Sequence, residues 1–232
     1  MNFVENAIKE QYEIISVLKK KENSEVLIIR HKTLKKEVIL RKFKGQADAY
    51  RMLQKINTDN IPTVFSVSTE NDVNYVLEEF IDGITVADVL EGGLYNESGA
   101  RVVVKSVCNA LSVLHSLNII HRDIKPENIM VSKTGEVYLI DFDAARIFKA
   151  FKTDDTCVMG TTGYAAPEQF GINQTDKRAD IFAIGVLLNV MLTGEHPSKK
   201  MYQGKLAKII EKCTKVSPNE RFQSVQEIIK KL

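Results

Sequence analysis

The stretch that decides the fold runs from residue 121 to residue 130 and reads His-Arg-Asp-Ile-Lys-Pro-Glu-Asn-Ile-Met. It places an acid (Asp123), a cation (Lys125) and an amide (Asn128) in one short segment, and a second acid, Asp141, follows the apolar run 137–140. Amide and carboxylate oxygens suit Mg²⁺, which prefers one or two carboxylates together with phosphate oxygens. A further carboxylate beside a lysine can orient a hydroxyl and neutralise the charge that moves in phosphoryl transfer. The spacing therefore predicts a phosphoryl-transfer site.

Composition and charge narrow the class of protein. Of the 232 residues, 44% are hydrophobic and 27% are charged, which is ordinary for a globular chain. The net charge of +2 comes from 32 basic and 30 acidic residues and argues against a nucleic-acid partner. Cys108, Cys157 and Cys213 are widely spaced and form no CxxC pair, which favours reduced thiols in a cytoplasm. No apolar run is long enough to span a bilayer and the N-terminus lacks a signal-peptide pattern, so we expect no membrane segment in this chain.

The hydrophobic pattern changes along the chain. β-branched and apolar runs predict strands over residues 12–18, 25–31, 37–43, 63–68 and 75–81, with one helix over 46–56. Helical spacing of apolar residues then predicts helices over 98–117, 179–193, 205–213 and 224–232, and the second of these is apolar nearly all round and should be buried. The pattern predicts an α+β protein. Residues 1–81 should form a five-stranded antiparallel sheet with one helix, and residues 82–232 a mostly helical second domain.

These motifs together resemble the eukaryotic-type serine/threonine protein kinases, including bacterial ones. The segment 121–130 resembles their catalytic loop, and Asp141-Phe142-Asp143 resembles their metal-binding motif with Asp in place of glycine. Residues 160–168, read Gly-Thr-Thr-Gly-Tyr-Ala-Ala-Pro-Glu, resemble their substrate-docking segment. Lys125 together with Thr161 resembles the serine/threonine branch. The resemblance implies a two-lobed kinase fold.

The resemblance also implies roles for single residues. Asp123 and Lys125 would be catalytic, and Asn128 and Asp141 would hold Mg²⁺. The residues expected to bind ATP are Leu18, Val26, Ile39, Arg41, Glu79, Ile81 and Met130. Met130 is equally well explained as an ordinary core residue. Two structural contacts are expected as well: Asp180 with the backbone of the catalytic loop, and Arg221 with Glu168.

A polar segment between residues 144 and 162 resembles an activation loop. It carries Thr153, Thr156, Thr161 and Thr162, and Arg122 is a candidate partner for a phosphate there. Whether these threonines are modified or are ordinary polar loop residues stays open.

The chain departs from the kinase pattern in its first third. The connector 19–24, Lys-Lys-Lys-Glu-Asn-Ser, has no glycine where the family has a glycine-rich loop, and its lysines either are solvated or attract phosphates. Arg41 replaces the strand lysine that reaches the phosphates, and Ala49 stands where the helix glutamate that pairs with this lysine would be. Asp143 replaces a glycine, and Asp tolerates a left-handed backbone better than most residues.

Arg41 and Glu78 are two unusual residues with one explanation. Alternation along the strand places Arg41 on the face expected to look into the nucleotide cleft, where an unpaired cation is costly. Glu78 stands on the neighbouring strand and faces the same way. We predict that Arg41 pairs with Glu78, which would replace the strand-to-helix bridge by a strand-to-strand one. The alternatives are that Arg41 is an exposed edge-strand charge and that Glu78 points to water.

Three functions fit these residues. The first is a Mg²⁺- and ATP-dependent kinase that phosphorylates serine or threonine in a protein, and the second is a pseudokinase that binds nucleotide or acts as a scaffold. A small-molecule phosphotransferase would not need Lys125 or the docking segment. Losing one phosphate contact typically costs about 10²–10³ in rate, whereas losing the metal ligands or the positioning acid would cost far more. We therefore predict a slow kinase. The sequence specifies neither the protein substrate nor the oligomeric state.

Overall fold

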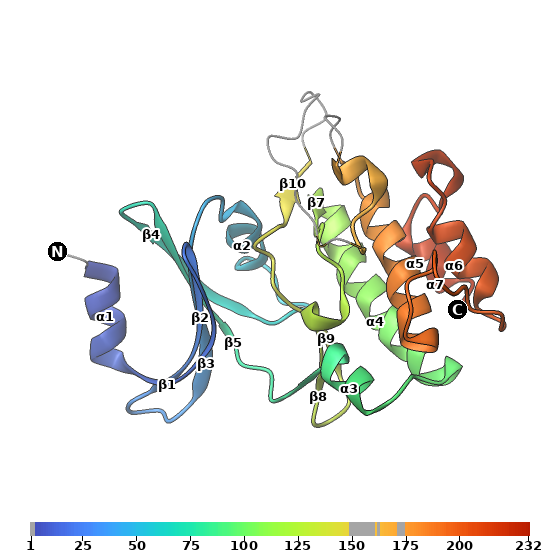
Figure 1. The fold of residues 1–232 in the computed structure, drawn as a ribbon. Coiled ribbons are helices and arrows are strands. Elements are labelled where there is room, and N and C mark those ends of the chain that lie inside the picture. Colours follow the sequence, from blue (N-terminus) through green and yellow to red (C-terminus); the bar gives the residue numbers. More distant parts are fainter. Residues whose placement is uncertain (1–2, 149–160, 162, 171–174) are drawn as a thin grey trace. The chain divides into compact units, whose positions relative to one another are not determined.

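The computed structural model describes residues 3–148, 161, 163–170 and 175–232. The chain divides into two compact units, Met1–Thr58 with Pro62–Asp82 and Asp59–Ile61 with Gly83–Leu232, and each is described by itself (Figure 1). Five residues that the sequence analysis quotes lie outside the described residues: Thr153, Thr156, Cys157, Gly160 and Thr162.

A five-stranded antiparallel sheet forms the first unit, as the alternating pattern predicts. Its spatial order is β1-β2-β3-β5-β4, from the strands β1 (Tyr12–Lys21), β2 (Ser24–His31), β3 (Glu37–Lys44), β4 (Val64–Glu70) and β5 (Val73–Glu79). The prediction that residues 19–24 connect the first two strands is wrong in its extent. All three lysines belong to β1, Lys21 pairs with Ser24, and Glu22 and Asn23 alone make the turn. The lysines extend the strand because a two-residue turn closes the hairpin.

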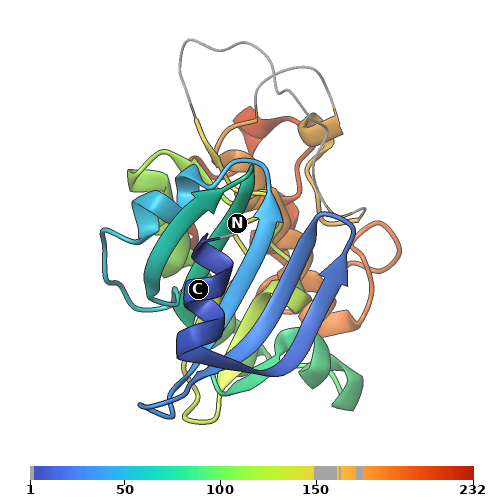
Figure 2. The same ribbon diagram turned by 90° about the vertical axis from the view of Figure 1, so that its left-hand side faces the viewer.

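Two helices flank this sheet where the sequence predicts one. The unpredicted helix is α1 (Phe3–Gln11), which lies across one face of the sheet (Figure 2). Val4 and Ile8 of α1 pack against a cluster of strand residues: Leu27, Ile29, Leu40 and Tyr75. The carboxylate of Glu70, in β4, accepts hydrogen bonds from the backbone N–H groups of Phe3 and Val4 at 2.8 and 2.9 Å. These contacts with the sheet stabilise a nine-residue helix that would be marginal alone.

Helix α2 (Asp48–Leu53) belongs to the opposite face of the sheet. Its Tyr50 ring lies 5.6 Å from the ring of Phe43 in β3. The helix is shorter than the predicted range 46–56, because the N–H groups of Lys55 and Ile56 bond to carbonyls three residues back and tighten its end into a turn.

The second unit is mostly helical, as predicted, with short strands between the helices. Its helices are α3 (Val86–Gly92), α4 (Glu97–Ser116), α5 (Arg178–Thr193), α6 (Ala207–Cys213) and α7 (Val225–Ile229), with 3₁₀ turns at Pro126–Asn128, Pro167–Phe170 and Pro218–Glu220. Its strands are β6 (Gly83–Thr85), β7 (Ile119–Ile120), β8 (Ile129–Ser132), β9 (Val137–Leu139) and β10 (Arg146–Ile147). Helix α3 was not predicted, although Thr85 and Asp88 form a capping box at its start.

Helices α4 and α5 carry about half of the buried hydrophobic residues of the second unit. Both begin and end within one residue of their predicted bounds, and thirteen of the sixteen residues of α5 are buried. Gly185 lets α6 approach closely, because a Cβ there would collide with Cys213 and Thr214. Cys108 is a free thiol, and burial raises its pKa to about 12, so it is core and not a nucleophile. Among the described helices, none has the length and apolar character needed to cross a bilayer.

Candidate active site

A hairpin of β8 and β9 positions the two proposed metal ligands. Ile129, the first residue of β8, pairs with Leu139, the last residue of β9. The N–H of Ile140 donates to the carbonyl of Asn128 at 2.9 Å. Asn128 and Asp141 therefore lie at the same end of the hairpin, although thirteen positions separate them in the sequence.

Asp180, at the start of α5, holds the backbone of the loop that precedes this hairpin, as the sequence predicts. Its carboxylate accepts hydrogen bonds from the N–H groups of His121 at 3.0 Å and Arg122 at 2.8 Å, and from Nε2 of His115 at 2.8 Å. Burial alone would raise the pKa of Asp180, but the bond and charge of His115 and the further bonds outweigh it, and the pKa is lowered. The bonded carboxylate keeps Arg122 in a left-handed conformation, φ 68°, which is uncommon for a long side chain.

Asp123 is the centre of the polar contacts in this loop. Its carboxylate receives hydrogen bonds from Nζ of Lys125 at 2.7 Å, from Oγ1 of Thr161 at 2.5 Å and from Nδ2 of Asn128 at 2.9 Å. Burial raises the pKa of Asp123, but the bonds from Lys125 and Thr161 lower it by more, and the net pKa lies below the ordinary value. Asp123 is therefore ionised at neutral pH and can accept a further hydrogen bond from an alcohol.

Nζ of Lys125 also donates a hydrogen bond to Oγ1 of Thr161, at 2.7 Å. One hydroxyl thus bridges the acid and the lysine. The sequence names Lys125 and Thr161 as a pair typical of the serine/threonine branch, and the structure brings the two side chains into contact.

The bonds of its amide nitrogen fix the orientation of the Asn128 side chain. That nitrogen donates to both the carboxylate and the main-chain carbonyl of Asp123, each at 2.9 Å, and the side chain is buried. The side-chain carbonyl oxygen is therefore the atom of Asn128 that can coordinate a cation. Among the residues that the structure describes, no cluster of three or more His, Cys, Asp or Glu side chains could hold a metal. An amide and one carboxylate, completed by phosphate and water oxygens, still match the ligands that Mg²⁺ takes.

The turn after Ile140 differs from its prediction. Asp141 itself has the left-handed backbone, with φ 66°, and Asp143, which stands in place of glycine, does not. The N–H of Asp143 lies 3.4 Å from the Asp141 carboxylate. A short polar side chain at Asp141 tolerates this conformation, so the exchange of glycine for Asp143 needs no strained backbone.

The predicted ATP residues of the first unit differ in exposure. Val26, Ile39, Arg41 and Ile81 are buried, whereas Leu18 is 56% exposed beside an irregularity in β1. The carboxylate of Glu79 accepts a hydrogen bond from the N–H of Thr63 at 3.0 Å. In the second unit Met130 is half-buried in β8, opposite Tyr138.

The predicted pair between Arg41 and Glu78 is confirmed. Nε of Arg41 lies 2.6 Å from Oε1 of Glu78, and the two residues are only 5% and 3% exposed. Both alternatives are wrong: Arg41 is not an exposed edge charge, and Glu78 does not point to water.

The predicted pair between Glu168 and Arg221 is also present. The two residues meet through two bonds, Nη1 to Oε1 at 2.6 Å and Nη2 to Oε2 at 2.8 Å. Arg221 also donates to three main-chain carbonyls, those of Arg178, Lys215 and Val216. The guanidinium is fully buried and lies 4.9 Å from the ring centre of Phe182.

Sequence reasoning missed two residues that support the loop. His115, near the end of α4, donates to Asp180, and Gln169 links the N–H of Ala166 to the carbonyl of Arg122 at 3.0 Å each. A histidine and a glutamine are compatible with solvent at these positions, so no sequence pattern marks them. Their burial becomes evident only from the folded chain.

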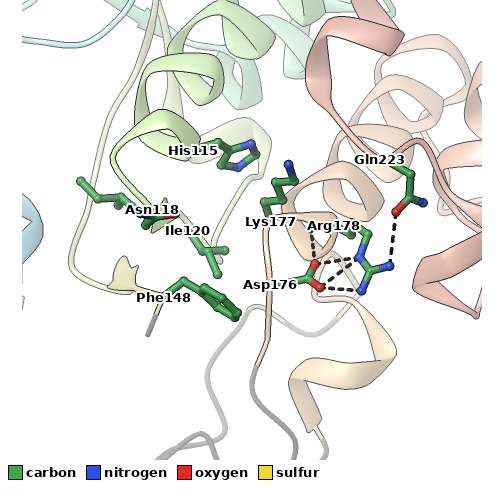
Figure 3. A pocket seen from close by; sticks show the side chains of 9 residues that line it. His115, Asn118, Ile120, Phe148, Asp176, Lys177, Arg178 and Gln223 are labelled. Atoms are coloured by element: carbon green, nitrogen blue, oxygen red, sulfur yellow. Dashed lines mark hydrogen bonds and ion pairs between the residues drawn. The ribbon is translucent and has the colours of Figure 1, made fainter. Parts of the chain in front are cut away.

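A pocket of about 440 Å³ lies elsewhere on the second unit (Figure 3). The guanidinium of Arg178 lies between Asp176 and Gln223 and is hydrogen-bonded to both side chains. None of the residues proposed for ATP binding, Mg²⁺ binding or catalysis lines this pocket. Its lining residue His115 is hydrogen-bonded to Asp180. Its lining residues are His115, Asn118, Ile119, Ile120, Phe148, Asp176, Lys177, Arg178 and Gln223.

Similarity to known proteins agrees with this geometry. Residues 13–232 match the family model described as the protein kinase domain. A probable serine/threonine-protein kinase of Clostridium perfringens is 32% identical over 230 residues, which cover 88% of this chain and 33% of the relative. A probable serine/threonine-protein kinase PknB of Bifidobacterium longum is 34% identical over 74% of this chain and 26% of its own length.

A plant relative gives the same result. A serine/threonine-protein kinase of Arabidopsis thaliana is 34% identical over 92% of this chain and 47% of its own length. The chain thus spans between about a fifth and a half of the length of the curated relatives it matches. With its catalytic-loop geometry and a family match over nearly all of its residues, the chain belongs to the protein kinase domain family.

Proposed function

We propose that this chain is a serine/threonine protein kinase domain that transfers the γ-phosphate of ATP to a protein hydroxyl with the help of Mg²⁺. The observation that supports it best is the set of contacts on Asp123, where Lys125, Thr161 and Asn128 all donate to one carboxylate. This arrangement orients an ionised acid beside a cation, which is what the transfer to an alcohol requires.

Each residue of the loop has a distinct task in this proposal. Asp123 accepts the hydrogen bond of the substrate hydroxyl and directs its oxygen at the phosphorus. Lys125 balances the negative charge that the transferred group brings. Asn128 and Asp141 hold Mg²⁺, which supplies neutralisation of the phosphate oxygens when it is bound.

The residues proposed to bind the nucleotide are those that the sequence predicts. Arg41 would contact the phosphates, and the main chain of Glu79 and Ile81 would bond to the adenine. The apolar side chains proposed to contact the adenine are Leu18, Val26, Ile39 and Met130. The three widely spaced cysteines favour a reducing compartment, so we place this activity in the cytoplasm.

Asp123→Asn tests the transfer directly. Purified protein is incubated with labelled ATP, Mg²⁺ and a general protein substrate, and label on serine or threonine is measured. We expect the variant to lose at least about 10³ in rate, because amide nitrogen cannot accept the hydroxyl proton. The matched control is Asp72→Asn, an exposed turn residue with the same chemical change, which should keep the full rate.

Asp141→Ala tests the metal site separately from the transfer. ATP should raise the melting temperature of the wild type only when Mg²⁺ is present, and this shift should disappear in the variant. An equal shift in Asp141→Ala would remove Asp141 from the metal site. Nucleotide binding without any label transfer, under conditions where the fold is intact, would instead favour the pseudokinase.

A further inference from the structure

The ion pair of Arg41 and Glu78 is built into one face of the sheet of the first unit. Arg41 lies opposite Val76 in the register of β3 and β5, and Glu78 lies opposite Ile39. The two charged residues are therefore diagonal neighbours on adjacent strands, and this spacing is within reach of long side chains. In this register Nε of Arg41 lies 2.6 Å from Oε1 of Glu78.

Apolar residues lie directly opposite both members of this pair on the neighbouring strands. Val26 lies opposite Arg41 on β2, and Val64 lies opposite Glu78 on β4. Both valines are no more than 5% exposed. A charge in such surroundings is strongly disfavoured unless an opposite charge accompanies it.

Helix α2 supplies no buried carboxylate of its own. Its sequence is Asp-Ala-Tyr-Arg-Met-Leu, in which Asp48 is the one acid. The side chain of Asp48 is 57% exposed and lies 3.4 Å from Arg51 of the same helix. Ala49, on the buried side, carries only a methyl group. The carboxylate partner of Arg41 thus comes from the sheet.

We propose that Glu78 is a positioning residue that orients the Arg41 guanidinium toward the phosphates of ATP. This inference rests on the proposed function. The strands β3 and β5 are joined by seven consecutive residue pairs, so the separation of Arg41 and Glu78 is set by the ladder. A partner on the six-residue helix α2, which has no side-chain cap, would be held less firmly.

The geometry also explains why an arginine, and not a lysine, occupies position 41. Glu78 is bonded through Nε, which lies at the side of the guanidinium group. A guanidinium carries five N–H donors on three nitrogens, so one group can bond a carboxylate at its side and a phosphate at its end. A lysine has a single nitrogen for both tasks. The two unusual residues therefore form one functional unit.

The test compares ligands with and without phosphates. Affinities of the wild type and Glu78→Gln for a non-hydrolysable ATP analogue with Mg²⁺, and for adenosine, are measured by calorimetry. We expect Glu78→Gln to weaken binding of the analogue about tenfold, which corresponds to one charge-assisted hydrogen bond, and to leave adenosine binding unchanged. If Glu78 had a purely structural role, Glu78→Gln would lower the affinity for both ligands equally, and this result would overturn the proposal.

Two matched control variants test whether a loss of affinity is specific to the pair of Arg41 and Glu78. Glu37→Gln removes a carboxylate of another strand-based Arg–Glu pair, with Arg30 at 2.7 Å, and should leave both affinities unchanged. Ala49→Gly loosens α2, because glycine is a much weaker helix former than alanine, and should also leave the affinity for the analogue unchanged, because the sheet holds Arg41. A tenfold loss in Ala49→Gly would instead make α2 the positioning element.

The outcomes distinguish this inference from the function on which it rests. No binding of the ATP analogue by the wild type would overturn the proposed function and this inference with it. Binding by the wild type that Glu78→Gln does not change would overturn the inference alone.

Discussion

Each unit of this chain pairs a buried arginine with a glutamate, and the two pairs are built differently. In the first unit Arg41 meets Glu78 across two adjacent strands, with side-chain exposures of 6% and 4%. In the second unit Arg221 meets Glu168 over 53 positions of sequence, and its guanidinium also donates to three carbonyls of the main chain.

The difference separates two ways of holding a buried charge. The register of a sheet brings Arg41 and Glu78 together, so the pair is a local consequence of strand pairing. Arg221 connects segments that no strand ladder aligns, and it donates to carbonyls of three different residues. We therefore expect Arg221 to matter mostly for stability and Arg41 mostly for nucleotide binding.

Arg221→Ala should give the largest effect on stability. It leaves Glu168 without its cation and three carbonyls without their donor, and we expect a loss of about 3–5 kcal/mol in the free energy of unfolding. Urea unfolding followed by circular dichroism measures it, without nucleotide. Arg178→Ala is the control, because Arg178 pairs with Asp176 at a partly exposed site and should cost about 1 kcal/mol or less. Equal costs for the two variants would contradict the structural role of Arg221.

Replacing both partners by apolar residues sharpens the comparison. Arg41→Met with Glu78→Leu should recover much of the stability that either single change loses, because no charge is left stranded. Arg221→Met with Glu168→Leu should still cost about 3 kcal/mol, since three carbonyls lose a hydrogen bond worth about 1 kcal/mol each. The same unfolding measurement compares the two doubles. Equal recovery at both sites would show that the carbonyl bonds of Arg221 contribute little.

Lowering the pH should reveal a third, smaller effect on stability, which arises from residues of the second unit. Burial lowers the pKa of His121, more strongly than the nearby carboxylates raise it, so the unfolded chain takes up a proton near pH 6.5 that the folded chain refuses. The free energy of unfolding should therefore keep its full value above about pH 6.5 and decrease below it, by at most about 1.4 kcal/mol per pH unit. The lowered pKa of Asp180 adds a second loss below about pH 4, where the unfolded chain protonates this carboxyl first.

His121→Gln isolates the first of these two losses. It should flatten the pH dependence of unfolding between about pH 6.5 and 5 and leave the loss below about pH 4 in place. His196→Gln, at a partly buried position just before a turn, is the matched control and should leave the whole profile unchanged. A profile that His121→Gln does not alter would show that His121 is not kept neutral by the fold.

Much of the fold and of the site follows from local pattern. The five strands of the first unit and the helices α4 and α5 were predictable because their apolar periods continue over many residues. The contacts of Asp180, Lys125 and Arg221 were predictable because their motifs stand in a recognisable order. Arg41 and Glu78 were predictable for a different reason: two charges expected on one enclosed face need each other.

The remaining features depend on residues far apart in the chain. Helix α1 needs the carboxylate of Glu70 and the apolar face of the sheet, and no pattern within its nine residues specifies either. His115 and Gln169 acquire their roles only because folding buries them beside the catalytic loop. The local residue chemistry of the sequence thus determined which side chains could carry out phosphoryl transfer. The tertiary structure decided which neutral groups support them, because burial, and not residue type, makes a hydrogen-bond partner obligatory.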